Sequence, residues 1–198
     1  ELTTRGIDQK EITLHVGAGT FTPVKTANAV EHQMHIEAFS VSGKLIESII
    51  AKEGNITAVG TTSCRSLESL YWIGVKIINN SIQPNKISLD QWEAYDLPDN
   101  YSYKESMNAI LEYMKKKELE ELHAQTGIMI TPGYEFKMIK SLITNFHQPS
   151  STLLMLIASF VGKDWKKIYQ YALDHDFRFL SYGDSSLLMP KNSGKQRF

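Results

Sequence analysis

Short apolar stretches occur along the whole chain, separated by polar turns that contain glycine, proline, asparagine or serine. In Glu11–Val16, for example, Ile12, Leu14 and Val16 stand at every second position, which is the period of a β-strand. The same kinds of pattern predict strands at Glu11–Val16, Met34–Val41, Ile56–Val59, Ile128–Thr131, Leu142–Ile143 and Phe177–Ser181.

Longer stretches repeat their apolar residues every three or four positions and predict amphipathic helices. Ser42 is a suitable N-cap for the first of them, which runs over about 43–52. Further helices are predicted around Leu67–Tyr71, from Ser102 to about Leu122, from near Ser151, and after Asp164.

Strand, loop and helix follow one another twice, at Ile56–Tyr71 and again at Leu142–Phe160. Such units favour parallel strands joined by right-handed crossovers. We therefore expect an α/β fold, a three-layer sandwich with a largely parallel sheet. An antiparallel edge is expected from Met34–Val41 or Phe177–Leu188. Residues 1–190 would form a single domain, and residues 191–198 a flexible tail.

Composition narrows the class of protein. A chain of 198 residues can bury roughly 70% of its unfolded surface in one core. The formal net charge of -1 gives no general attraction to nucleic acid or to a membrane. The single cysteine, Cys64, fits a reducing compartment, and no run of eighteen apolar residues occurs. These features predict a soluble, cytoplasmic protein.

The first six residues, Glu1–Gly6, resemble the end of a helix that stops at Gly6. Because the sequence begins with Glu1, we expect it to be a fragment whose missing part would contribute to any active site.

The polar turn 144–149 lies between a predicted strand and a predicted helix, where α/β sheets commonly place their ligands. It contains Asn145 and His147, the first candidates for chemistry. The N–H groups at the start of the following helix favour anions. The alternative is that Asn145 closes the turn and His147 caps it.

A second candidate loop follows the strand Glu11–Val16. Its glycines would let the backbone approach a ligand closely, although the dinucleotide-binding fingerprint is incomplete. A tight turn that requires positive φ is the alternative. The residues concerned are Gly17, Gly19, Thr20 and Phe21.

His32, His35 and Glu37 form the one spacing that suggests a metal site. On a helix the two histidines would share a face, but the surrounding residues alternate like a strand, which would turn them to opposite sides. A histidine pair that binds substrate or is hydrogen-bonded is therefore favoured over a metal site.

Two further groups could contact a ligand. Thr61, Thr62 and Ser63 supply hydroxyls and N–H groups at a helix start, suited to a carboxylate or phosphate, unless they only cap the helix. The carboxylate of Asp184, in the turn that follows Tyr182, could bind a ligand hydroxyl, unless it only shapes the turn. Arg65 and Glu68 lie three apart on the second helix, as in a surface ion pair.

Six segments in one order resemble the S-adenosylmethionine:tRNA ribosyltransferase-isomerase family of queuosine biosynthesis. They are Thr13–Phe21 (TLHVGAGTF), Glu31–Glu37 (EHQMHIE), Ala58–Glu68 (AVGTTSCRSLE), Thr131–Phe136 (TPGYEF), Leu142–Leu156 (LITNFHQPSSTLLML) and Phe177–Asp184 (FRFLSYGD). The resemblance covers most of the chain and corresponds to the C-terminal portion of the family, whose members also carry an N-terminal part and a β-barrel domain.

The resemblance implies transfer of the ribosyl moiety of S-adenosylmethionine to 7-aminomethyl-7-deazaguanine at the wobble position of tRNA. The product would be epoxyqueuosine, with adenine and methionine released and no metal expected. Because a half-built site loses positioning, we expect the fragment alone to bind S-adenosylmethionine weakly and not to turn it over.

The implied site follows from this chemistry. The sulfonium acidifies its neighbouring carbon, so a base is needed, and His147, His35 and His15 are the candidates in that order. Departure of adenine would be assisted by Glu37, Asp184 or Tyr182. The methionine carboxylate would bind at Thr61, Thr62 and Ser63, with Arg65 as counter-charge. Asn145 and the glycine loop would complete the pocket. Phe21 or Phe146 would stack on a base.

Two other functions fit parts of the sequence. The first is a metal-dependent hydrolase that uses His32, His35 and Glu37. The second is a tRNA-binding module without catalytic activity.

Overall fold

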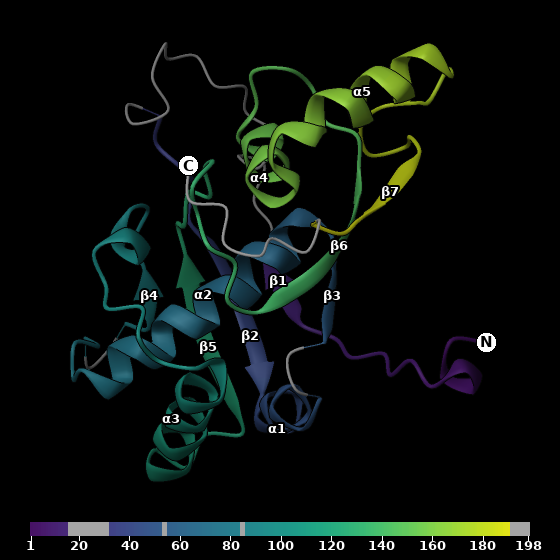
Figure 1. Ribbon diagram of the computed structural model, residues 1–198. Coiled ribbons are helices and arrows are strands. Elements are labelled where there is room, and N and C mark those ends of the chain that lie inside the picture. Colours follow the sequence, from purple (N-terminus) through teal and green to yellow (C-terminus); the bar gives the residue numbers. More distant parts are fainter. Residues whose placement is uncertain (16–31, 53–54, 84–85, 191–198) are drawn as a thin grey trace.

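The computed structural model describes residues 1–15, 32–52, 55–83 and 86–190 (Figure 1). Its elements in chain order are η1 (Thr3–Arg5), β1 (Thr13–His15), β2 (Glu37–Ser42), α1 (Gly43–Ala51), β3 (Ile56–Val59), α2 (Thr61–Ile78), β4 (Ser88–Leu89), η4 (Glu93–Tyr95), α3 (Tyr103–Lys116), β5 (Glu121–Thr126), β6 (Ile139–Asn145), α4 (Thr152–Val161), η5 (Gly162–Asp164), α5 (Trp165–Asp174) and β7 (Ser185–Leu188), where η denotes a 3-10 helix.

The described strands form two sheets, in the orders β1-β2-β5-β4 and β3-β6-β7. Parallel pairing joins β4 to β5 and β3 to β6. Antiparallel pairing joins β1 to β2, β2 to β5 and β6 to β7. The α/β class is therefore confirmed, and β7 provides the antiparallel edge. The expectation of one largely parallel sheet is corrected, because hydrophobic periodicity reveals a strand but neither its direction nor its partner.

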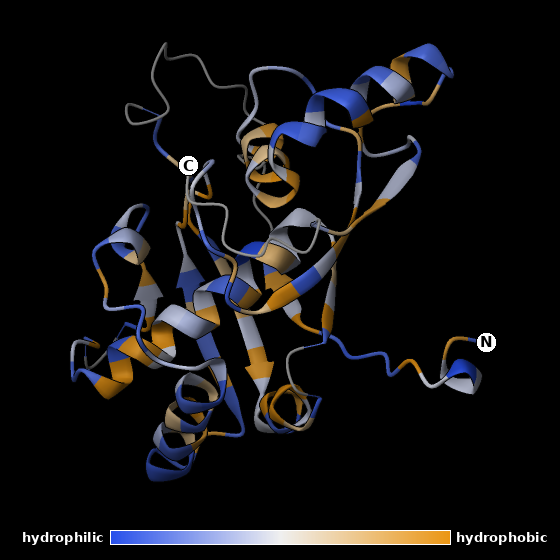
Figure 2. Cartoon of the chain, viewed as in Figure 1, coloured by the Kyte–Doolittle hydropathy of each residue, from blue (hydrophilic) through white to orange (hydrophobic). Residues whose placement is uncertain are grey.

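Helix α2 is the central element, buried almost all round over its length. It contacts β3 and β6 of one sheet, β4 and β5 of the other, and α3. In Figure 1, α1 and α3 lie at one end of the molecule and α4 and α5 at the other. Most of α5 carries blue, hydrophilic residues in Figure 2, whereas α4 is mainly orange, as expected for a helix that faces the core.

Several buried polar side chains on α2 are matched by hydrogen bonds, although the Ser66 Oγ and the Arg65 Nη2 have no such partner in the described structure. The Glu68 carboxylate accepts the N–H groups of Lys137, Met138 and Ile139 at 2.8 to 3.0 Å and the Tyr134 hydroxyl at 2.9 Å. Burial raises the pKa of Glu68, and these donors oppose that rise. The carboxylate thereby ties α2 to the segment that leads into β6.

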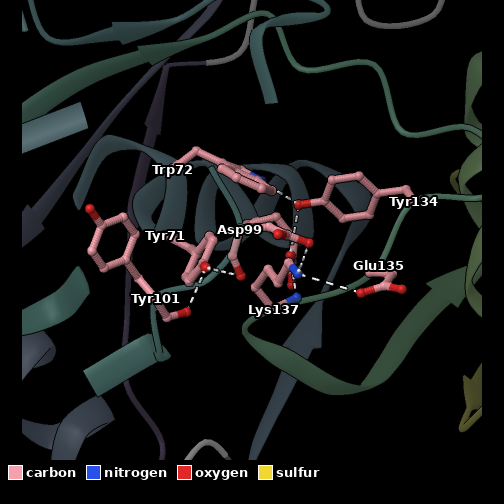
Figure 3. Close-up of polar contacts among 8 residues, drawn as sticks. Tyr71, Trp72, Asp99, Tyr101, Tyr134, Glu135 and Lys137 are labelled. Carbon is pink, nitrogen blue, oxygen red and sulfur yellow. Dashed lines mark hydrogen bonds and ion pairs between the residues drawn. The ribbon is translucent and has the colours of Figure 1, made fainter. Parts of the chain in front are cut away.

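Aromatic residues and Lys137 extend this network (Figure 3). The Trp72 indole N–H donates to the Tyr134 hydroxyl at 2.8 Å, and the Lys137 Nζ lies 5.9 Å from the ring centres of both Tyr71 and Trp72. Tyr71 in turn donates its hydroxyl to the Tyr101 carbonyl at 2.7 Å. This network fixes the segments before α3 and β6 against one face of α2.

The helix N-termini at α1, α3 and α4 agree with the sequence. Ser42, Ser102 and Ser151 accept the N–H groups of Leu45, Glu105 and Leu154 respectively. Gly6, with φ of 75°, ends η1, which is shorter than the helix expected there. None of the helices in the described parts of the chain is long and apolar enough to cross a membrane.

Three predicted elements differ from the structure. Helix α3 ends at Lys116 rather than near Leu122, because Glu118 takes a positive φ of 53° and Leu122 belongs to β5. Ile128–Thr131 lies outside the strands, although its first three residues are buried. Phe177–Ser181 is not a strand, since its aromatic rings pack on Phe146 and Leu180 turns the chain with a φ of 69°.

We predict that Gly74→Ala destabilises the protein by about 1 to 3 kcal/mol, because an added Cβ would overlap backbone atoms of Ser106 where α2 crosses α3. Urea unfolding followed by circular dichroism measures the effect. Gly43→Ala is the matched control, since its Cβ would meet its nearest neighbour at 3.8 Å. Equal stability of the two variants would contradict the prediction.

Candidate functional site

A cavity of about 620 Å³ opens at the carboxyl ends of the parallel strands β3 and β6. The start of α2 forms one side, and the loop and helix start that precede α4 form the other. Its described lining consists of Leu14, Val59, Gly60, Thr61, Thr62, Ser63, Thr144, Asn145, His147, Gln148, Pro149, Ser150, Ser151, Thr152, Leu153, Leu180 and Ser181. None of these side chains carries a permanent charge, so the cavity offers hydroxyls, amides and N–H groups beside apolar surface.

The start of α2 lies in the wall of the cavity, and a helix N-terminus of this kind favours anions. Its N-cap is Gly60, with φ of 93° and ψ of 147°, and no described side chain caps the helix. The first intrahelical bond runs from the Cys64 N–H to the Gly60 carbonyl, so the N–H groups of residues 61–63 precede the hydrogen-bonded turns. The alternative that Thr61, Thr62 and Ser63 only cap the helix is therefore wrong.

Gly60 is required by this geometry. Its backbone conformation is one that residues with a side chain rarely adopt, and its N–H donates to the Ile143 carbonyl at 2.8 Å. The turn thereby fastens the start of α2 to the end of β6. The sequence signal for it was the Gly-Thr-Thr triplet between strand and helix, and Gly60 itself was missed as a candidate.

His147 lines the cavity and is 8% exposed. Its backbone N–H donates to the Tyr169 hydroxyl at 3.1 Å, and its Nε2 lies 3.1 Å from the Thr144 Oγ1. Burial lowers the pKa of His147 to about 4, so the imidazole is neutral at pH 7. A neutral ring in a cavity can accept a proton from a bound ligand.

Asn145 serves the turn that follows α5, which is not the turn 144–149 that the alternative expected it to close. Its amide donates to the carbonyls of Gly183 and Asp184, both at 3.3 Å. Asp184 accepts the Arg178 N–H at 2.7 Å, which also lowers the pKa of the Asp184 carboxyl. Asn145 lines the cavity, whereas the carboxylate of Asp184 is engaged within the turn.

Glu37, Arg65 and His35 form a second polar cluster, outside the cavity lining. The Arg65 Nη1 donates to the Glu37 Oε2 at 2.7 Å, and its Nε donates to the Ile128 carbonyl at 3.1 Å. His35 Nε2 lies 3.6 Å from the Glu37 Oε1, and burial lowers the pKa of His35. Arg65 and Glu68 are both buried, so the expected surface pair between them is corrected.

The other predicted site residues are dispersed. His15 ends β1 as an exposed residue, next to Leu14 in the cavity lining. Tyr182 is 99% exposed, and Phe146 is buried among aromatic rings. Gly17, Gly19, Thr20 and Phe21 lie outside the described residues.

The described residues contain no group of three or more His, Cys, Asp or Glu side chains placed to hold a metal ion. The proposed ligand Glu37 is instead bound by Arg65, and the His32 carbonyl accepts the Gln91 amide at 2.7 Å. Glu37 is therefore held by an ion pair, whereas the His35 Nε2, 3.6 Å from Glu37, has no hydrogen-bond partner in the described structure.

We predict that Arg65→Met lowers the free energy of unfolding by about 3 kcal/mol or more, because it leaves Glu37 charged and buried. The double variant Glu37→Leu/Arg65→Met should recover much of that loss. A double-mutant cycle by urea unfolding measures the coupling. The exposed pair Lys52–Asp8 is the control, and Lys52→Met should leave stability nearly unchanged. Additive effects at Glu37 and Arg65 would contradict the prediction.

Comparisons with known proteins agree on one family. A family model described as queuosine biosynthesis protein matches residues 1–188. An S-adenosylmethionine:tRNA ribosyltransferase-isomerase of Burkholderia mallei (strain SAVP1) is 36% identical, over 98% of this chain and 45% of its own length. A Burkholderia ambifaria protein of the same name is 35% identical over the same shares.

A solved structure supports the same relationship. The crystal structure of S-adenosylmethionine tRNA ribosyltransferase from Thermotoga maritima matches with a TM-score of 0.55 and 28% identity, over 94% of this chain and 46% of that one. The chain thus spans about half the length of the relatives that it matches. The resemblance inferred from the six sequence segments is confirmed, and the chain belongs to the queuosine biosynthesis protein family.

Proposed function

We propose that this chain provides the S-adenosylmethionine site of a tRNA ribosyltransferase-isomerase. The reaction would transfer and isomerise the ribosyl moiety of S-adenosylmethionine onto 7-aminomethyl-7-deazaguanine in tRNA, giving epoxyqueuosine and releasing adenine and methionine. The observation that carries the proposal is the cavity of about 620 Å³ with the uncapped start of α2 in its wall. Its volume is within the range of small-molecule sites.

The cavity matches the parts of S-adenosylmethionine. The N–H groups of residues 61–63, which no described side chain caps, suit the methionine carboxylate, because a helix N-terminus attracts negative charge. No acidic side chain among the described lining residues would repel that carboxylate. Leu14, Val59 and Leu153 offer apolar surface for the adenine ring.

We assign the proton-abstracting role to His147 among the three candidate histidines. It is the one of the three that lines the cavity, and its imidazole is neutral at pH 7, which is the protonation state that a base requires. His35, Glu37 and Arg65 lie outside the cavity lining and would support the start of α2 one helical turn beyond Thr61. His15 remains a candidate through its neighbour Leu14.

The rest of a full-length relative would complete the reaction. Because this chain corresponds to less than half of the Burkholderia mallei enzyme, we expect it to bind S-adenosylmethionine without releasing adenine. The partner would be tRNA with a 7-deazaguanine base at the wobble position, and a tRNA substrate implies a cytoplasmic location.

Calorimetric titration of the chain tests the proposed site. We expect S-adenosylmethionine to bind, and decarboxylated S-adenosylmethionine to bind about tenfold more weakly or worse, because a charged acceptor at the start of α2 is lost. Gly60→Ala should weaken binding of S-adenosylmethionine, because alanine is strained in the backbone conformation of Gly60. Relief of that strain would move the N–H groups of residues 61–63.

Gly133→Ala is the matched control for this titration. Gly133 also has a positive φ, of 105°, but lies outside the described cavity lining, so its replacement should leave affinity unchanged. Equal affinity for the two ligands would show that the carboxylate binds elsewhere. A chain that binds neither ligand would count against the proposed function.

Burial of His147 also predicts a pH dependence of stability. The unfolded chain binds a proton below about pH 6.5, whereas the folded chain does so only near pH 4, so stability should fall as the pH drops from about 6.5 to 4. The contribution is about 3 kcal/mol and should disappear in His147→Gln. Urea unfolding across this pH range measures it, with the exposed His123→Gln as control. Identical slopes for the His147→Gln variant and the wild type would refute the assignment.

A further inference from the structure

Several hydrogen bonds hold the exposed turn Arg178–Ser185. The Asp184 N–H donates to the Arg178 carbonyl at 2.8 Å, and the Asp184 carboxylate accepts the Arg178 N–H at 2.7 Å. The Gly183 N–H donates to the Leu180 carbonyl at 2.9 Å. From outside the turn, Asn145 donates to the carbonyls of residues 183 and 184. The turn is therefore fixed in place before any ligand arrives.

Two residues of this turn have backbone requirements. Leu180 adopts a φ of 69°, and its N–H donates to the Phe146 carbonyl at 2.9 Å. Gly183 lies so close to the Arg178 backbone that an added Cβ would overlap it. Conformations of this kind cost free energy and persist where the surrounding structure maintains them.

Tyr182 lies at the tip of the turn and is 99% exposed, the most exposed large hydrophobic side chain in the described part of the chain. The two residues before it, Leu180 and Ser181, line the cavity, as does the supporting residue Asn145. Tyr182 itself does not belong to the cavity lining. A hydrogen-bonded turn thus holds an exposed aromatic ring beside the cavity but outside its described lining.

We propose that Tyr182 stacks on an unpaired nucleobase of the RNA substrate as that base approaches the cavity. This inference rests on the proposed function, in which S-adenosylmethionine fills the cavity and a base of tRNA must reach it. A ring outside the lining meets the second substrate rather than the first. Aromatic side chains recognise single-stranded RNA bases in this way, and a preformed turn reduces the entropy lost on stacking.

The test measures binding of a fluorescently labelled hairpin RNA, whose loop carries an unpaired guanine, to the 198-residue chain by anisotropy. We expect Tyr182→Ala to weaken binding about tenfold or more, and Tyr182→Phe to retain it, because the ring rather than the hydroxyl makes the contact. For a hairpin with an abasic site in place of the guanine, the affinity of the wild type should fall to that of Tyr182→Ala for the intact hairpin. Tyr182→Ala itself should lose little further affinity when the guanine is removed.

Tyr171→Ala is the matched control, since Tyr171 is 58% exposed on α5 and stacks on His175 of its own chain. It should bind the hairpin like the wild type. The proposal is overturned if the wild type does not bind the hairpin, if Tyr182→Ala binds normally, or if Phe loses as much affinity as Ala. It is also overturned if Tyr182→Ala loses affinity for S-adenosylmethionine but not for RNA.

Calorimetry with S-adenosylmethionine separates this inference from the proposed function. A wild type that fails to bind S-adenosylmethionine contradicts the proposed site, whatever Tyr182 does. Because the Tyr182 side chain is fully exposed, its replacement should leave the thermal unfolding midpoint unchanged, so a loss of RNA binding reports on the contact itself.

Discussion

The burial of helix α2 between two sheets is the constraint on which the rest of the structure depends. In a helix enclosed on nearly all sides, a buried polar side chain costs free energy unless it is hydrogen-bonded. Arg65 is matched by Glu37 of β2, and Glu68 by the N–H groups that precede β6. At Gly74 the absence of a side chain lets α3 approach. Polar matching thus joins α2 to both sheets at defined positions.

The same constraint creates the cavity. Glu68 holds the beginning of β6 against α2, and the bond from Gly60 to Ile143 holds its end. The uncapped start of α2 and the His147 loop consequently face each other across the ends of two parallel strands, the usual ligand position of such sheets. The charged cluster of Glu37, Arg65 and His35 supports this arrangement without entering the cavity lining. The charged side chains of this cluster thus lie outside a cavity whose described lining carries no permanent charge. Such a cavity suits a ligand that carries charges of its own.

Periodicity and capping residues were sufficient to predict most elements. Ser42 and Ser151 begin helices as expected, and the strand, loop and helix unit from Ile56 onward is present in full. Prediction failed where an apolar run is compatible with two kinds of structure. Leu122 continues the spacing of α3 but lies in β5, and the aromatic run from Phe177 packs on Phe146 instead of joining a sheet. The local pattern indicates that a residue is buried, but the segment that buries it lies elsewhere in the chain.

The sequence by itself determined the α/β class, the family, and the two loops that form the cavity, because these depend on residue types at short spacing. Only the tertiary structure decided that Arg65 binds Glu37 rather than Glu68, that Asn145 fastens a turn almost 40 residues away, and that Tyr182 stands free beside the cavity. These outcomes depend on contacts between distant segments, and the free energy of such contacts depends on burial and geometry that no local pattern contains.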